Sequence, residues 1–242
     1  MNTKRIIKII FTIISAILFL YFTKVKFGPI LGTNMKFSLS VFFGPTLAKI
    51  FGLAYGTSTI ILTHLLGLLA GIFWPGGKYI FKIKAFKDYL TFLPIIFAGI
   101  YFSRIFKKDK RLIFIPLICI LLFVINPIGR TVWFYSCFWL IPVVISLFKE
   151  KLDKILRFPI FKIFGYSLGS AFVDHAIGSV IFLYLLKIPG EFWIKAIPMT
   201  IVERLMIAVG IELCYFAELV IIKVFGKIPI LAKIKSFVFQ EN

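Results

Sequence analysis

Long apolar runs, separated by short charged breaks or by breaks that contain glycine and proline, make up most of the chain. The runs are Ile9–Phe22, Phe37–Ala54, Tyr55–Trp74, Asp88–Phe106, Leu112–Ile125 and Thr131–Phe148, followed by two within Pro159–Phe225. Most are close to the ~20 residues that an α-helix needs to span a bilayer. The pattern predicts an all-α, polytopic membrane bundle of about eight transmembrane helices. The number falls to about six if the second and third runs form a hairpin that dips only partway into the bilayer.

Composition agrees with this pattern. The chain of 242 residues is 60% hydrophobic and has a mean hydropathy of +1.00. A soluble domain contains about 45–50% apolar residues, and no soluble fold of this size could bury such an excess. The runs are also continuous, unlike the short alternating segments of a membrane β-barrel. We therefore expect the lipid bilayer to be the environment of the chain.

The formal charge of +19 first suggests a nucleic-acid-binding protein, but the positions of the charges argue against that class. Lysine and arginine lie almost entirely between the apolar runs, where they would meet anionic lipid headgroups. With eight helices and the N-terminus inside, about 18 basic residues fall on the inner side and about 10 on the outer side. The bias predicts a multi-pass protein of the cell membrane with both termini in the cytoplasm.

Three parts can be distinguished along the sequence. Residues 1–36 form an N-terminal transmembrane helix and loop, residues 37–226 the helical membrane bundle, and residues 227–242 a basic tail. The first run follows a basic start, as in a secretory signal peptide. No small-x-small cleavage site comes after Phe22, so we expect this helix to remain uncleaved.

The run from Pro159 to Phe225 contains the candidate chemistry. It is expected to form two long helices joined by a loop from Lys187 to Pro198. The ionisable residues within these helices are Asp174, His175, Glu203, Arg204, Glu212 and Glu218. Such groups are costly inside a bilayer and by default mark a substrate or ion site. The alternative is a purely structural ion pair between Arg204 and one of the acids.

Counting residues gives expected depths for these groups below their shared outer loop. At about 1.5 Å per residue, Glu203 and Arg204 should lie roughly 8–9 Å below Pro198. Asp174, His175 and Glu212 should lie roughly 17–21 Å below it, near the midplane. Glu203 and Glu212 are nine residues apart, so they should point to opposite sides of their helix and cannot both face one cavity.

His64 is a further candidate. Thr57, His64 and Gly71 are seven residues apart and share one helix face, which should point into the bundle. A lone buried histidine can be a satisfied structural group, or it can contact a substrate or carry a proton.

Small residues recur every four positions at Gly44, Ala48, Gly52 and Gly56. Such spacing lets helix backbones approach closely. One interpretation is packing within the bundle, and the other is docking of a partner membrane protein.

No nucleotide-binding, zinc-protease or serine-hydrolase motif occurs in the sequence, so an ATPase that powered transport would have to be another chain. The three cysteines, Cys119, Cys137 and Cys214, all fall inside apolar runs without a shared motif spacing. We therefore expect no disulfide, no metal and no cofactor.

One family resemblance follows from these residues. The segment Phe43-Gly44-Pro45-Thr46, leading into Gly52 and Gly56, resembles the Gly-Pro segment of the substrate-binding S components of energy-coupling-factor (ECF) transporters. The late block Asp174-His175-Ala176-Ile177-Gly178, followed by Pro198 and Glu203-Arg204, falls where such proteins carry polar residues on their last two helices. The resemblance covers Phe37 to Val224 and leaves the first helix as an addition.

The resemblance implies a small membrane subunit that binds a vitamin-like solute from outside and pairs with a transmembrane coupling protein and two cytoplasmic ATPases. A solute-binding subunit is our first hypothesis, and the candidate residues of its site are Asp174, His175, Glu203, Arg204, Glu212 and His64. Two rival classes stay open. One is an integral membrane enzyme that acts on a lipid-linked substrate through Asp174, His175 and Glu203. The other is a structural membrane protein with internal salt bridges and no ligand.

Overall fold

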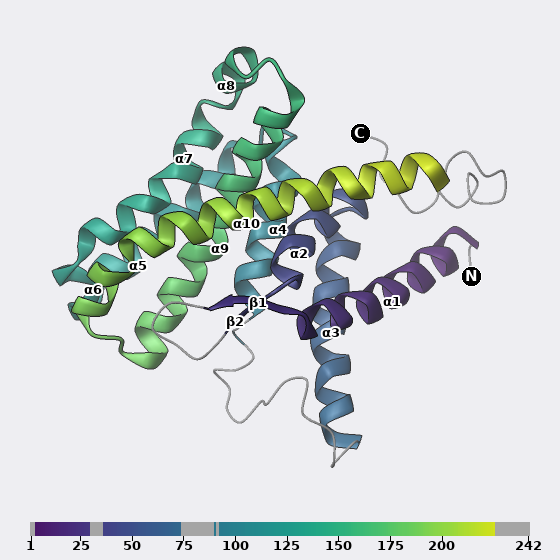
Figure 1. Ribbon diagram of the computed structural model, residues 1–242, viewed down its shortest axis with the longest axis horizontal. Coiled ribbons are helices and arrows are strands. Elements are labelled where there is room, and N and C mark those ends of the chain that lie inside the picture. Colours follow the sequence, from purple (N-terminus) through teal and green to yellow (C-terminus); the bar gives the residue numbers. More distant parts are fainter. Residues whose placement is uncertain (1–2, 30–35, 74–89, 91, 226–242) are drawn as a thin grey trace.

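Helices dominate the computed structural model, which describes residues 3–29, 36–73, 90 and 92–225 (Figure 1). The α-helices are α1 (Thr3–Lys24), α2 (Ser40–Ile50), α3 (Leu53–Phe73), α4 (Leu93–Ile105), α5 (Phe114–Ile125), α6 (Pro127–Thr131), α7 (Leu140–Leu147), α8 (Lys149–Ile155), α9 (Pro159–Leu186) and α10 (Gly190–Phe225). Two 3₁₀ helices, η2 (Lys110–Ile113) and η3 (Trp133–Trp139), lie between them. The expectation of a helical bundle is thus confirmed for the residues described.

A short antiparallel ribbon is the departure from helix. Strand β1 (Lys26–Pro29) pairs with β2 (Lys36–Ser38), with Lys26 opposite Ser38 and Phe27 opposite Phe37. The Leu39 amide donates a hydrogen bond to the Val25 carbonyl at 3.0 Å. The ribbon therefore connects α1 to α2 through a segment that the sequence had suggested would be a loop.

Helix α9 lies at the centre of the packing. It contacts α4 and α10 most extensively, and α5 and α7 pack against it as well. Helix α10 continues past α9 to α2, and Figure 1 shows it crossing the molecule toward the end where α1 lies. Helices α1 and α3 pack against each other beside α2. Residues on α9 and α10 therefore face several helices at once.

The outer surface of the bundle is apolar. Large hydrophobic side chains are exposed along α5, on α7 and down one side of α10; examples are Leu121 (58% exposed), Val144 (49%) and Leu213 (64%). A water-soluble monomer rarely exposes so much contiguous apolar surface. Several polar groups, by contrast, are buried between the helices. The chain therefore has the organisation expected of a membrane protein, with an apolar outer surface around a partly polar interior.

Two of the described helices are long and apolar enough to cross a bilayer, Pro159–Leu186 and Gly190–Val224. The helix pair Trp133–Leu147 and Lys149–Ile155 is bent by 76°, and it adds a third candidate span if the two helices are counted as one. Only Thr12–Lys24 of α1 and Leu53–Leu66 of α3 could be assessed for length and hydropathy, because the side chains at the other end of each helix are not described. The expected six to eight spans stay a prediction, as do the three-part division of the chain and the positions of the termini.

The connection between α9 and α10 is shorter than expected. The sequence suggested a loop from Lys187 to Pro198, but α10 already begins at Gly190 and Pro198 lies inside it. This expectation was wrong because proline was taken as a helix boundary. Membrane helices tolerate an internal proline, since neighbouring groups satisfy the backbone carbonyl that it leaves without a donor.

The expected single helix over Thr131–Phe148 is also divided. Asn126 caps α6, where its Oδ1 accepts hydrogen bonds from the Ile128 and Gly129 amides at 2.9 and 3.4 Å. The chain then passes through the 3₁₀ helix η3 before α7 begins at Leu140. The break that Asn126-Pro127 indicated is confirmed, and the 3₁₀ segment after it has no clear signal in the sequence.

Two further expectations lie outside the described residues. One is the end of the third apolar run at Trp74, and the other is the basic tail, residues 227–242.

Small residues pack helices within this chain. A Cβ atom on Gly56 of α3 would lie 2.4 Å from the Cα of Ala48 on α2, and one on Gly99 of α4 would lie 3.2 Å from the Ala48 side chain. Gly44 faces Ile95 of α4 in the same way. Three of the predicted small positions therefore serve internal packing, the first of the two interpretations. A Cβ atom on Gly165 of α9, by contrast, would have no other group within 4 Å.

Exchange of Gly56 for alanine should destabilise the protein by about 1–3 kcal/mol, because the new methyl group would overlap the backbone of α2. The same exchange at Gly165 is the control and should stabilise α9 by up to about 1 kcal/mol, since alanine has the higher helix propensity. Thermal unfolding in nanodiscs measures both effects. Equal changes at the two positions would contradict the close crossing of α2 and α3.

Candidate functional site

Arg204 on α10 is the centre of a buried ion-pair cluster. Its Nη1 lies 3.0 Å from Oδ2 of Asp174 on α9, and its Nη2 lies 3.5 Å from Oε2 of Glu203. The Ala171 carbonyl of α9 accepts a further contact from Nη1 at 3.5 Å. The side chains of Arg204, Glu203 and Asp174 are only 4%, 11% and 12% exposed. One guanidinium group is therefore enclosed with two carboxylates between the two longest helices.

The short α9–α10 connection explains why these residues meet. Arg204 is fourteen residues after Gly190, about 21 Å along α10, and Asp174 is twelve residues before Leu186, about 18 Å along α9. The expected depth difference between Arg204 and Asp174 was wrong, because it was counted from Pro198. The two residues lie at nearly the same depth, so one guanidinium group can reach the opposite helix.

A second set of polar groups adjoins the first. The Tyr135 hydroxyl, on η3, lies 3.0 Å from Nε2 of His175 and 2.9 Å from Oγ1 of Thr200. A phenol hydroxyl can donate one hydrogen bond and accept another, so it can join both partners. His175 follows Asp174 on α9, and Thr200 lies one turn before Arg204 on α10. The two sets are thus neighbours on both helices.

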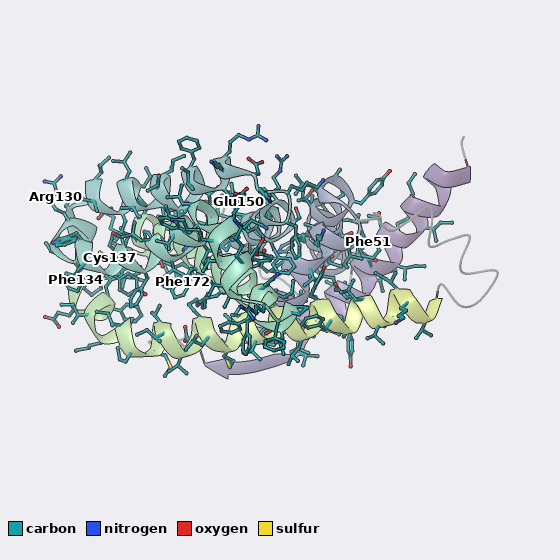
Figure 2. The ribbon with its side chains drawn as sticks, turned by 90° about the horizontal axis from the view of Figure 1, so that it is seen from above. Phe51, Arg130, Phe134, Cys137, Glu150 and Phe172 are labelled. Atoms are coloured by element: carbon teal, nitrogen blue, oxygen red, sulfur yellow. The ribbon has the colours of Figure 1, made fainter. Side chains whose placement is uncertain are left out.

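Aromatic rings enclose the second set. The Tyr135 ring lies 5.0 Å from that of Trp193, 6.0 Å from that of Phe123 and 5.6 Å from that of His175. Phe172 also lies edge-on to His175, at 6.4 Å between centroids. Figure 2 shows Phe172 among the helices and Phe134 and Cys137 toward one end of the molecule. The Tyr135 hydroxyl and its partner His175 therefore lie in largely aromatic surroundings.

The sequence did not identify Tyr135 and Thr200 as site residues. A signal was available for Tyr135, because a buried tyrosine normally needs a partner for its hydroxyl group. In the structure, His175 and Thr200 are the partners of that hydroxyl group. Nothing in the sequence places Thr200 toward η3, since its position depends on how α10 packs against η3.

Two candidate residues lie apart from the cluster. His64 is on α3, where its Nδ1 lies 2.9 Å from the Ile60 carbonyl and its ring lies 4.5 Å from that of Phe92. Glu212 is buried on α10 but lies two turns beyond Arg204. Because it is nine residues from Glu203, it occupies the opposite edge of the buried face of α10. The structure therefore brings together four of the six predicted residues: Asp174, His175, Glu203 and Arg204.

Glu218 makes a separate connection between helices. Its Oε1 accepts a hydrogen bond from the Thr46 hydroxyl at 2.7 Å, which joins α10 to α2. Among the described residues, no three histidine, cysteine or acidic side chains are placed to hold a metal ion, and the cysteines at 119, 137 and 214 are all free.

A charged region follows α4. Asp109 lies 2.8 Å from both Arg111 and Arg104. Its hydrogen bonds from Arg111 and then from Arg104 hold the pKa of the Asp109 carboxyl well below its usual range. Nearby, Lys149 pairs with Asp153 at 2.6 Å, and Asp153 also accepts a hydrogen bond from the Tyr166 hydroxyl. These pairs fix the loop after α4 and the start of α8.

The chain is similar to an uncharacterized protein of Methanocaldococcus jannaschii, MJ0923, with which it shares 28% identity over 198 residues. The match covers 79% of this chain and 63% of the relative, so the chain spans less than two thirds of that protein's length. No family model and no solved structure matches the chain.

Proposed function

We propose that the chain is a solute-binding membrane subunit of a transport system, similar to the S components of ECF transporters. In this proposal Asp174, His175, Glu203 and Arg204 hold the polar end of a small vitamin-like solute. A transmembrane coupling subunit and cytoplasmic ATPases would be its partners. Six to eight spanning helices, with both termini in the cytoplasm, belong to the same proposal.

The observation that carries this proposal is the enclosure of Arg204 with two carboxylates inside helices whose outer faces are apolar. Packing alone could use contacts of small residues, as Gly44, Gly56 and Gly99 do between α2, α3 and α4, at much lower desolvation cost. If both are ionised, two carboxylates beside one guanidinium group leave one formal negative charge. The site therefore suits a solute that has hydrogen-bond donors or a cationic centre. His64 and Glu212 are not needed for it.

Solute binding to the purified protein tests the proposal. The full chain in nanodiscs is screened against a panel of vitamins and their precursors by thermal unfolding, and any solute that raises the melting temperature is titrated. Exchange of Arg204 for lysine keeps the buried charge but loses the planar, two-sided geometry of the guanidinium group. It should weaken binding about tenfold or more, equivalent to about 1.4 kcal/mol.

Arg157, which is exposed just before α9, gives the matched control. Its exchange for lysine should leave solute affinity within about twofold, a difference below about 0.5 kcal/mol. The proposal is overturned if no solute in the panel binds or if both exchanges weaken binding equally. Turnover of a lipid-linked substrate, abolished when His175 is exchanged for alanine, would support the enzyme instead.

A further inference from the structure

A basic cavity lies away from the α9–α10 cluster, where α2 and α4 end and α3 begins. Its volume is about 190 Å³, and its lining residues are Ala48, Lys49, Leu53, Ser103, Arg104 and Lys107. Three of these six residues are cationic and none is acidic. Figure 1 shows α2 and α4 side by side at this part of the molecule. The cavity thus concentrates positive charge between helix ends.

Lys49 is the most enclosed of the three cations. The residue is only 7% exposed, and its Nζ lies 4.3 Å from the centroid of the Phe106 ring. Lys107 lines the same cavity and is exposed. Two like charges that line one cavity repel each other, and a bound anion would relieve that repulsion.

Basic side chains outnumber acidic ones in the lining of the cavity, which has three basic residues and no acidic one. Arg104 is paired with Asp109 beside the cavity, and the same carboxylate also accepts hydrogen bonds from Arg111. The Glu218 carboxylate meets α2 one turn earlier, at Thr46, and does not line the cavity.

Cations near helix C-termini also interact favourably with the helix dipole. That effect accounts for Lys49 and Arg104, which lie in the last turns of α2 and α4. It does not explain why Lys107, beyond the end of α4, lines the same cavity. The first turn of α3, with Leu53 at the cavity, has no acidic residue and adds the positive end of a helix.

The size and place of the cavity narrow the class of ligand. Pockets for drug-sized molecules are about 300–1,000 Å³, so a cavity of about 190 Å³ fits a smaller group. Basic pockets between membrane helices recognise the headgroups of anionic lipids. We propose that this cavity binds a phosphate group, with Lys49, Arg104 and Lys107 as its cations and the Ser103 hydroxyl as a further donor. The phosphate can belong to a phospholipid headgroup or be free in solution.

Binding to the delipidated full chain in detergent tests this site. One arm adds short-chain phosphatidylglycerol and counts bound lipid by native mass spectrometry, with short-chain diacylglycerol as the phosphate-free comparison. The other arm titrates inorganic phosphate against chloride at equal ionic strength and follows thermal unfolding. Phosphatidylglycerol binding alone identifies a lipid headgroup, whereas binding in both arms shows that the phosphate group itself is sufficient.

Exchange of Lys107 for glutamine should weaken phosphate binding about tenfold, equivalent to about 1.4 kcal/mol. The melting temperature of the unliganded protein should not fall, because the exchange removes a repulsion with Lys49. Lys154, which is exposed on α8 outside the cavity, provides the same exchange as a control. Its variant should bind within about twofold of the unmodified chain.

Exchange of Ser103 for alanine gives a second variant that changes no charge and should weaken binding by a smaller factor. The inference is overturned if neither phosphatidylglycerol nor phosphate binds in preference to its comparison. It is equally overturned if the exchanges at Lys107 and Lys154 have the same effect on binding. None of these outcomes depends on solute binding at Arg204, so the two proposals stand or fall separately.

Discussion

Exchange of Arg204 for methionine should lower the free energy of unfolding by about 3–5 kcal/mol, the range for removal of one partner from a buried ion pair. The cost arises because Asp174 and Glu203 stay buried, with 12% and 11% of their side chains exposed, after the guanidinium group has gone. Methionine keeps much of the volume of arginine and can pack in its place. The effect should therefore be electrostatic rather than the result of a cavity.

Rescue by neutral partners checks this origin. A chain that carries Arg204→Met together with Asp174→Asn and Glu203→Gln should recover most of the lost stability, because no uncompensated charge is then buried. Exchange of Arg111 for methionine is the matched control. Arg111 also lies 2.8 Å from a carboxylate, but its side chain is 76% exposed, so the exchange should change stability little. Unfolding of all three proteins in mixed micelles with increasing dodecyl sulfate compares them.

Failure of the rescue would contradict the ion pair as the source of the effect. A successful rescue would show that charge balance, and not a unique set of side chains, holds α9 against α10. If the rescued chain is stable but no longer binds the solute, the charges serve binding as well as packing. Stability and solute affinity measured on the same variant therefore separate the structural interpretation from the functional one.

The sequence predicted the class of fold because burial by lipid leaves a strong pattern. Apolar runs of spanning length, with lysine and arginine between them, indicate membrane helices without any knowledge of tertiary contacts. Local breaks were also readable where the backbone itself requires them. Asn126-Pro127 ends α5 as expected, because the Asn126 side chain caps the next helix and proline fits its first turn.

Features that depend on tertiary packing were harder to predict. Pro198 was taken as the end of a loop, although it lies within α10. That single error displaced the expected depth of Arg204, so the sequence did not show that Arg204 and Asp174 lie at nearly the same depth. His64 shares a face with Thr57 on α3, as periodicity suggested, but its ring lies against Phe92 rather than at the cluster. Periodicity gives a direction around one helix, and only packing decides which helix lies there.

Tyr135 shows how such packing creates a site that the sequence did not reveal. Exchange of Tyr135 for phenylalanine removes one hydroxyl group and keeps the ring that contacts Phe123 and Trp193. Thr200, which is buried, and His175, which is partly buried, then each lose a hydrogen bond. Leaving the buried Thr200 hydroxyl unsatisfied should cost about 1–3 kcal/mol of stability, and His175 should add a smaller amount.

Exchange of Tyr184 for phenylalanine provides the matched control. The Tyr184 hydroxyl donates one hydrogen bond, to the Leu122 carbonyl at 2.8 Å, and its side chain lies at the surface of α9. Its loss should have a much smaller effect, since the carbonyl has other partners within its own helix. Thermal unfolding in nanodiscs compares the two variants. Equal losses would mean that the Tyr135 hydroxyl does not join η3 to both long helices, and the polar set around His175 would then be held by aromatic packing alone.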